Sequence, residues 1–538
     1  MSSVKKDNGL LRSSGIVSFF TMLSRLMGLA RDIVFARVIG ADAFADVFFV
    51  AFKIPNFFRR LFAEGAFAQA FVPVLGEYRE KGSEAAVRGL IDRVSGTLGL
   101  TLLIFTLIII LSAPLLAGLF APRWFLEAPI KFAATTEMLR ITFPYLLFIS
   151  MTGVAGGVLN SYDRFAVPAF TPVLLNTSLI CAALFAAPLF QQPAFALAWG
   201  VLIAGIVQFI FQLPFLYRIH MLPTPVVDWQ DSGVRKILLL MGPAIYGVSV
   251  SQINLLLDTM LATFLPTGSV SWLYYSDRLS ELPLGVFGVA IATVILPNLS
   301  RHHIANSNDV YSATLDWAVR LVLLIAVPAA AALMLLSEPI LITLFYYGDV
   351  MTAKDMLMAS YSLRAYAFGL VAFMLIKVLA PGFFARQDMR TPVRVGIIAM
   401  VSNMALNILF VLPLHHYWQM GHLGLAAATS VSAFVNALLL LVYLRRQQIY
   451  APTAGWFVFI IRLIVAVTTM MVALYLMADY HLLLQFDVWQ AKLWWQRTVA
   501  ILGLCGMGFC VYGLMLVATG LRWADLRGPA KATQDRRG

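Results

Sequence analysis

Long apolar stretches recur from one end of the chain to the other. A helix needs about 20 mostly apolar residues to cross a bilayer, and by this measure we expect about fourteen spanning helices. Of the 538 residues, 60% are hydrophobic and 12% are charged, which is more apolar surface than one soluble core buries. The chain is therefore predicted to be an all-α integral membrane protein. The predicted spans are 15–39, 45–66, 95–120, 138–159, 167–189, 193–216, 237–264, 270–298, 316–345, 360–384, 392–413, 421–444, 455–478 and 497–520.

Lysine and arginine residues are distributed unevenly between alternate loops. If the N-terminus is cytoplasmic, the cytoplasmic segments hold most of them, and the other side holds few. We therefore expect both termini to be cytoplasmic. The net charge of +12 does not indicate a nucleic-acid partner, because the basic residues are scattered at helix ends instead of gathered on one face. The few basic residues on the expected periplasmic side are Arg123, Lys131, Lys354, Lys492 and Arg497.

Three sequence landmarks recur at one spacing. Pro297 follows Pro73, Arg364 follows Arg140 and Pro392 follows Pro168, each after 224 residues. This spacing covers six predicted spans, so it predicts an old duplication with both halves in the same orientation. We expect two six-helix lobes around a central cavity, followed by two additional helices and a basic cytoplasmic tail. The expected boundaries are 1–225 and 226–450 for the lobes, 451–521 for the additional helices and 522–538 for the tail.

Charged residues occur inside several predicted spans. A charge at membrane depth costs roughly 2.5 to 3.5 kcal/mol on insertion scales, so it needs a polar cavity, a partner or an interface. Guanidinium groups suit the oxygens of a phosphate, which they bind through two parallel hydrogen bonds. The arginines inside the spans therefore either bind a phosphate group of a substrate or are each neutralised by a neighbouring acid. The charged residues are Arg25, Arg31, Asp32, Lys53, Arg59, Arg60, Glu64, Asp277, Arg278 and Glu281.

Several longer motifs lie on or beside these charged spans. They are Ser24-Arg25, Gly28 to Asp32, Phe52 to Asn56, Arg59 to Phe67, Met241 to Ala244, Tyr275 to Arg278 and Ala380 to Asp388. With these motifs, nearly the whole chain resembles the MurJ (MviN) lipid II flippases of the multidrug/oligosaccharidyl-lipid/polysaccharide exporter superfamily. The resemblance implies a transporter and not an enzyme. Its substrate would be lipid II, the undecaprenyl-pyrophosphate-linked peptidoglycan precursor, moved to the periplasmic leaflet of the inner membrane by alternating access for cell-wall synthesis and cell shape.

The resemblance also implies substrate-binding positions and partners. Lipid II and the bilayer are the expected partners, other cell-wall synthesis proteins are a further expectation, and the last two helices are expected to form a groove for the lipid tail. The acids among the binding positions are expected to orient arginines more than to carry protons. The implied substrate-binding residues are Ser24, Arg25, Arg31, Asp46, Arg59, Asp277, Arg278, Glu281 and Arg462.

Two alternatives remain within transport, and one lies outside it. A flippase for another polyprenyl-pyrophosphate-linked glycan needs the same cationic chemistry. A drug exporter of the same superfamily fits less well, because a cation exporter is expected to have an acid-rich cavity. A membrane enzyme acting on polyprenyl-linked sugars would need a catalytic loop, and no predicted loop is long enough to form one.

The energy source is the least determined feature. No cofactor is expected and no nucleotide-binding motif is visible, so coupling to a monovalent cation or to the membrane potential is the remaining hypothesis. Asp258, together with Asn403 and Asn407 on one helix face, has the oxygens for a cation. In the alternative, Asp258 pairs with an arginine and the two asparagines join helices by hydrogen bonds.

The histidines and several tryptophans receive no substrate role. The seven histidines, His422 among them, lie at predicted loops or span ends and are expected to be solvated. Trp272, Trp456 and the pair Trp494-Trp495 lie where an interfacial aromatic belt is expected.

Overall fold

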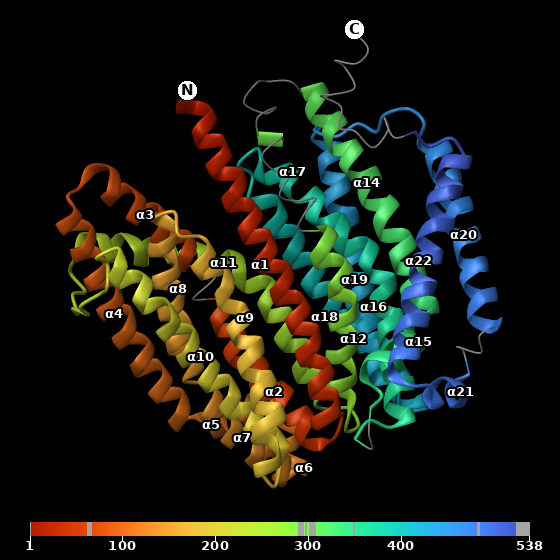
Figure 1. Cartoon of the computed structure of the whole chain (residues 1–538), viewed down its shortest axis with the longest axis horizontal. Helices are drawn as coiled ribbons and strands as arrows, with labels where there is room; N and C mark the ends of the chain where they lie inside the picture. Colours follow the sequence, from red (N-terminus) through yellow and green to blue (C-terminus); the bar gives the residue numbers. More distant parts are fainter. Residues whose placement is uncertain are drawn as a thin grey trace. The chain divides into compact units, whose positions relative to one another are not determined.

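Helices make up the folded part of the chain. The computed structural model describes residues 2–61, 67–288, 295, 299–300, 308–347, 350–480 and 485–522, and Figure 1 shows its helices coloured along the sequence. Within these residues there is no strand, so the predicted all-α class is confirmed. Ten of the described helical segments are long and apolar enough to cross a membrane. The total of about fourteen spans stays a prediction.

Four predicted spans are not among those ten. Their described parts are α1 (Ser2–Val38), α2 (Ala43–Phe58), α11 (Ser232–Ala262) and α12 (Ser269–Pro283). Every charged candidate residue except Arg462 lies on one of these helices or directly after it. The chemistry predicted from the sequence is therefore concentrated on the least typical membrane helices.

The first compact unit comprises residues 1–271. Within it, α1 packs against α9, α10 packs against α8 and α9, and α2 packs against α7. Proline stands at the start of α5, α6, α7 and α10, where its fixed φ suits a helix and its missing N–H is not needed. The remaining helices are α3 (Phe67–Lys81), α4 (Glu84–Leu111), α5 (Ala113–Phe120), α6 (Pro122–Glu127), α7 (Pro129–Thr142), α8 (Tyr145–Ser161), α9 (Ala166–Cys181), η2 (Ala182–Ala186), η3 (Ala187–Leu189) and α10 (Pro193–Arg218).

The second compact unit comprises residues 272–538. Here α19 packs against both α16 and α18, and α14 packs against α16. The last two long helices, α20 and α22, lie side by side as the blue ribbons of Figure 1. Helix α20 also packs on α14. The helices after α12 are η4 (Leu284–Gly288), α14 (Asn308–Leu335), α15 (Ser337–Phe345), α16 (Ala353–Leu379), α17 (Pro381–Phe384), α18 (Arg390–Trp418), α19 (Gly421–Arg446), α20 (Trp456–Tyr480), α21 (Phe486–Ala491) and α22 (Trp494–Ala518).

Each unit has its own apolar core. In the first unit, side chains such as Phe71, Leu90 and Val158 pack together from α3, α4 and α8. In the second, Leu315 and Met374 pack with neighbours from α18 and α19. Residues that face away from these cores are also largely apolar and exposed, as expected for helices that face lipid.

The helix starts repeat the spacing found in the sequence. Helices α5, α7 and α9 begin at residues 113, 129 and 166, and α15, α16 and α18 begin at 337, 353 and 390, in each case 224 residues later. The left-handed turn at Asp163 (φ 59°) also recurs at Gln387 (φ 61°). These matches support a duplication.

The predicted lobe boundaries stay predictions. The division by packing falls at Ser271, after α11, because α11 packs against α2, α3 and α4. Glu64 of the charged span, Pro297 of the repeat and most of the basic tail lie outside the described residues.

Candidate functional site

The Arg31 side chain is buried in the first unit beside Asp32, with exposed fractions of 5% and 2%. Arg31 Nε and Nη2 donate to Asp32 Oδ1 over 3.0 and 2.7 Å, and Nη1 donates to Asn176 Oδ1 over 3.1 Å. The Asn176 amide donates to the Ser24 carbonyl over 3.0 Å. Because a buried charge needs a partner of opposite sign, Asp32 balances Arg31 within α1. The structure thus brings Ser24 and Arg31 together through Asn176 on α9.

Arg25 has a different environment on the same helix. Six residues turn an α-helix by about 240°, so Arg25 faces away from the Arg31 and Asn176 contacts. Its side chain is half-buried, and its guanidinium has no ion pair or hydrogen bond within the part of the chain that the structure describes. Arg25 therefore keeps its donors available for an anion from outside the protein.

Asp46, in the first turn of α2, accepts hydrogen bonds from the loop and first turn that begin α12. It is 2% exposed, and its carboxylate accepts hydrogen bonds from Gly268 N over 2.7 Å, from Ser271 N over 3.0 Å and from Ser271 Oγ over 2.7 Å. The nearest described cation is Lys131 Nζ, 4.0 Å from Oδ2. In the described residues Asp46 thus orients the start of α12, and it has no arginine partner.

Two further cations lie on or beside α2. Lys53 Nζ donates to Thr259 Oγ1 on α11 over 3.1 Å. Arg59 caps the C-terminus of α2, and its Nε donates to Asn56 Oδ1 over 3.1 Å. Both side chains therefore form polar contacts inside the first unit. The residues that follow in the charged motif, 62–66, lie outside the described residues.

In the second unit, α12 carries Asp277, Arg278 and Glu281. Arg278 Nη1 lies 2.9 Å from Glu281 Oε2, three residues along the helix. The guanidinium also lies over the Tyr274 ring, 5.2 Å from its centroid, a cation–π contact. The two paired side chains are 33% and 42% exposed. Such a solvated pair contributes little stability.

Arg462 lies on α20, beside the end of α22. Its side chain is half-buried, and its Nη2 would be 3.1 Å from a Cβ at Gly520. Gly520 has φ +94°, so a residue with a side chain would be strained there as well as crowded. The structure therefore places this candidate within the helix pair of the second unit.

The candidate cation ligands belong to different units. Asn403 and Asn407 on α18 are fully buried, and Asn407 Nδ2 donates to Asn403 Oδ1 over 2.9 Å. Asn403 Nδ2 donates to Thr429 Oγ1 on α19 over 3.4 Å. Asp258 is half-buried on α11 of the first unit. The asparagine contacts fit the interpretation in which they join helices, and among the described residues no group of three His, Cys, Asp or Glu side chains could hold a metal.

The prediction that His422 is solvated is wrong. His422 is 0% exposed, its Nδ1 lies 2.8 Å from Ser362 Oγ, and its ring meets the edge of the Trp272 ring at 4.9 Å. Trp272 is buried too, at 3% exposure, and its Nε1 donates to Asp355 Oδ1 over 2.7 Å, so it is not an interfacial tryptophan. The cause is that helix ends in the second unit pack against one another instead of ending in solvent.

Asp316 is a buried carboxylate that the sequence did not single out. It is 2% exposed, and its Oδ1 accepts hydrogen bonds from Tyr450 Oη and Trp456 Nε1, each over 2.8 Å. Its Oδ2 lies 2.9 Å from Arg320 Nε. Burial and the hydrogen bond to Asp316 raise the pKa of Tyr450 above its usual value. Asp316 therefore fastens the segment before α20 to α14, and its i, i+4 spacing from Arg320 was the one available signal.

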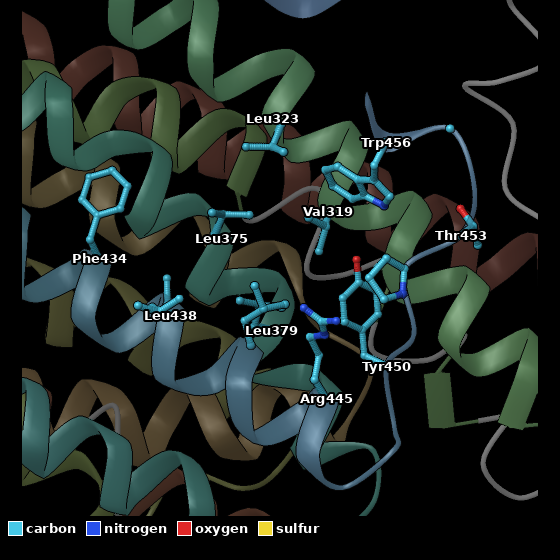
Figure 2. Close-up of a pocket in the computed structure, with 14 residues that line it drawn as sticks. Val319, Leu323, Leu375, Leu379, Phe434, Leu438, Arg445, Tyr450, Thr453 and Trp456 are labelled. Atoms are coloured by element: carbon cyan, nitrogen blue, oxygen red, sulfur yellow. The ribbon is translucent and has the colours of Figure 1, made fainter. Parts of the chain in front are cut away.

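An apolar cavity of about 570 Å³ lies beside this segment, between α14, α16 and α19. Figure 2 shows Leu323, Leu375 and Phe434 along its wall, with Arg445 and Tyr450 next to each other at one end. A second cavity, of about 520 Å³, lies between α20 and α22 and is lined mostly by apolar residues such as Val499. The second unit thus has two recesses whose walls suit apolar chains.

Comparison with known proteins gives a consistent result. Residues 35–489 match the model of the family described as "Lipid II flippase MurJ". A Vibrio cholerae protein named "Probable lipid II flippase MurJ" is 49% identical over 536 residues, which cover 98% of this chain and 99% of the relative. A Burkholderia cenocepacia protein named "Lipid II flippase MurJ" is 40% identical over 528 residues, covering 97% of this chain and 100% of the relative.

Solved structures agree on the fold. The structure titled "Lipid II flippase MurJ, inward closed conformation" matches with a TM-score of 0.75 and 26% identity, covering 93% of this chain and 97% of the other. An inward-facing multidrug resistance MATE family transporter of the MOP superfamily matches with a TM-score of 0.66 and 16% identity, covering 80% of this chain and 97% of the other. At that identity the second match shows a shared fold only.

Proposed function

Because the chain belongs to the lipid II flippase MurJ family, we propose that it moves lipid II from the cytoplasmic to the periplasmic leaflet of the bacterial inner membrane. The observation that carries this proposal is the likeness over almost the full length to relatives named as lipid II flippases, at 49% and 40% identity. Its role is that of a multi-pass membrane transporter for peptidoglycan synthesis, working by alternating access and not as an enzyme.

The chemistry of the charged helices supports a pyrophosphate-bearing substrate. Arg25 has donors that no described residue uses, and Arg278 lies beside the partly exposed Glu281 and over the Tyr274 ring. A guanidinium binds two phosphate oxygens at once, and this binding strengthens where water is scarce. We assign Arg25 and Arg278 to the translocated pyrophosphate, and Arg31, held by Asp32 and Asn176, to positioning α1.

The helix pair α20 and α22 supports an apolar substrate tail. The recess between these helices is lined by apolar residues such as Met477, Val499 and Leu504. Such a surface suits the apolar polyprenyl chain of the substrate. The distribution of basic residues supports a cytoplasmic position for both termini. Other cell-wall synthesis proteins are proposed partners.

Energy coupling to a monovalent cation or to the membrane potential is a separate proposal. Asp258 is the test residue, because it is the one carboxylate among the three candidate ligands, and Asn403 and Asn407 offer amide oxygens. Reconstituted protein should lose lipid II flux when all ion gradients are removed. Flux that persists both without gradients and in Asp258→Ala would remove the cation proposal.

The decisive experiment compares substrates in reconstituted vesicles. The protein should translocate lipid II and leave an unrelated polyprenyl-pyrophosphate-linked glycan in place, with Arg25→Ala as the inactive control. Equal transport of both would favour the alternative of a general lipid-linked glycan flippase. Transport of neither, but of organic cations, would favour the drug-exporter alternative.

A further inference from the structure

A small cavity of about 320 Å³ lies in the first unit, and none of the charged residues of α2 lines it. Its wall is formed by α1, by the turn between α8 and α9, and by the end of α10. Arg164 and Arg218 line it from two different elements, together with apolar residues such as Ile16 and Phe215. It therefore combines two cations with an apolar surface.

Both arginines have their donors available. Neither guanidinium forms an ion pair or hydrogen bond with a described residue, and both side chains are exposed to the cavity. The Arg218 guanidinium lies over the Phe215 ring, 5.7 Å from its centroid, which limits the directions it can take. Asp163 also lines the cavity, so the lining carries one positive charge more than it carries negative charges.

The equivalent position in the second half of the chain carries an acid instead of Arg164. Residue 388 follows residue 164 by 224 positions, and there Asp388 accepts hydrogen bonds from Thr391 N over 3.0 Å and from Thr391 Oγ1 over 2.6 Å at the start of α18. In the first unit the same position is Arg164, whose guanidinium has no acceptor to offer the start of α9. An acid in one half is thus replaced by a base in the other, and no described acid forms an ion pair with that base.

An apolar path leads from the cavity into the helices. The Phe215 ring contacts Phe211 at 5.4 Å between centroids, Phe211 contacts Phe170 at 5.5 Å, and Phe170 contacts Phe20 at 5.4 Å. All four rings are only half-buried. On α10, α9 and α1 these residues lie toward the middle of the helix from the cavity residues. An amphiphile could therefore place an anionic head at the arginines and an apolar chain along the rings.

We propose that this cavity binds the phosphate group of an anionic phospholipid. Arg164 and Arg218 bind the phosphate oxygens from two sides, and the rings from Phe215 to Phe20 contact an acyl chain. A free phosphate ion would bind the arginines but would form no contact with the four phenylalanine rings. With the orientation predicted from the basic loops, the bound lipid belongs to the cytoplasmic leaflet.

Lipid binding to the full-length protein tests the proposal. The delipidated protein in detergent is titrated with phosphatidylglycerol, and bound lipid is counted by native mass spectrometry. Loss of two charge-assisted hydrogen-bonding partners in Arg164→Gln/Arg218→Gln should weaken binding by about tenfold or more. The matched control is Arg88→Gln/Arg235→Gln, which removes two exposed basic residues of the same unit that do not line the cavity and should bind as the unchanged protein does.

A second variant separates charge from space. Ala166→Trp keeps both arginines but fills the cavity that Ala166 lines, so it should also lose phosphatidylglycerol while unfolding at the same temperature. Equal binding by the cavity variants and the control variant would overturn the proposal. Equal binding of zwitterionic phosphatidylethanolamine would overturn the requirement for an anionic lipid, and displacement of phosphatidylglycerol by inorganic phosphate alone would show that the site takes a free ion.

Discussion

Arg31 Nη2 lies 2.7 Å from Oδ1 of Asp32, its immediate neighbour on α1. Both side chains are almost fully buried, so each charge depends on the other for its solvation. The family resemblance implied that Arg25 and Arg31 act alike on the substrate. Their surroundings differ instead, and the difference can be measured.

Arg31→Ala should lower the amount of folded protein. Removing one partner of a buried ion pair leaves the other charge uncompensated, at a cost of about 3 to 5 kcal/mol. Protein level in the membrane and thermal unfolding in detergent measure this loss. The double variant Arg31→Ala/Asp32→Ala removes both charges and should recover part of it. A single variant as stable as the unchanged protein would show that Arg31 is not held by Asp32.

Arg25→Ala should leave the protein level unchanged and abolish lipid II translocation. Its guanidinium has no described partner to leave unpaired, so the fold loses little. Arg25→Lys should restore translocation only in part, because lysine keeps the charge but not the two-pronged geometry. The measurements are quantitative immunoblotting and flux in vesicles. Full flux through Arg25→Gln would remove Arg25 from the substrate path.

Gly96→Ala should destabilise the first unit. A Cβ at Gly96 on α4 would meet the backbone of Val226 at less than 3.0 Å, and that backbone is held by the hydrogen bond from Val226 N to the Asp92 carbonyl, 3.0 Å. Overpacking costs about 1 to 3 kcal/mol.

At Gly99, three residues later, the Cβ would meet Met151 Sδ at an ordinary 3.7 Å. Gly99→Ala should therefore gain up to about 1 kcal/mol from helix propensity. Unfolding midpoints in detergent compare the two, and equal shifts would contradict the argument.

Asp388→Ala should cost about 1 kcal/mol, as loss of a helix cap does. Partial burial acts to raise the pKa of Asp388, but the hydrogen bonds from Thr391 and the charge of Arg390 outweigh it and lower the pKa below its ordinary 3.8. The stabilisation is therefore fully present above pH 3.8 and is lost as the pH falls through the lower folded pKa. Unfolding of both proteins is measured against pH. Arg164→Ala, at the equivalent uncapped position, should show no such pH-dependent difference in lipid-free detergent.

The sequence predicts those features that the membrane imposes. Bilayer thickness fixes the length of apolar helices, so the spans and the all-α class follow from composition along the chain. The 224-residue spacing also follows, because proline and arginine landmarks stay where helices begin and end. Contacts between residues far apart in the sequence cannot be predicted in this way. Asn176 and Arg31, for example, are 145 residues apart, and no periodic pattern connects them. His422 shows the same limit, because its position at a span end does not reveal which helices cover it.

The contacts of Asp316 show how the segment before α20 is attached to α14. Its carboxylate accepts hydrogen bonds from Tyr450 and Trp456 and lies 2.9 Å from Arg320. At their other end the last two long helices are held separately, because Arg497 donates to the carbonyls of Ile342 and Tyr346 over 3.3 and 3.1 Å. Two independent attachments mean that losing one should loosen the segment before α20 without unfolding the second unit.

Asp316→Asn should therefore expose the segment 447–455 to protease while most of the fold survives. The amide keeps the shape of the carboxylate but gives Arg320, 24% exposed, no opposite charge. Its NH₂ group, in the place of Oδ2, cannot accept the hydrogen bond that Oδ2 accepts from Thr453 Oγ1. We expect a loss of about 2 to 3 kcal/mol, less than for a fully buried pair because Arg320 reaches solvent. Limited proteolysis of the purified protein, with the cut mapped by mass spectrometry, measures the exposure. Asp309→Asn, on an exposed residue of the same helix, is the matched control and should be cut like the unchanged protein. Cleavage of Asp316→Asn throughout the second unit would show that Asp316 supports the whole unit instead of one attachment.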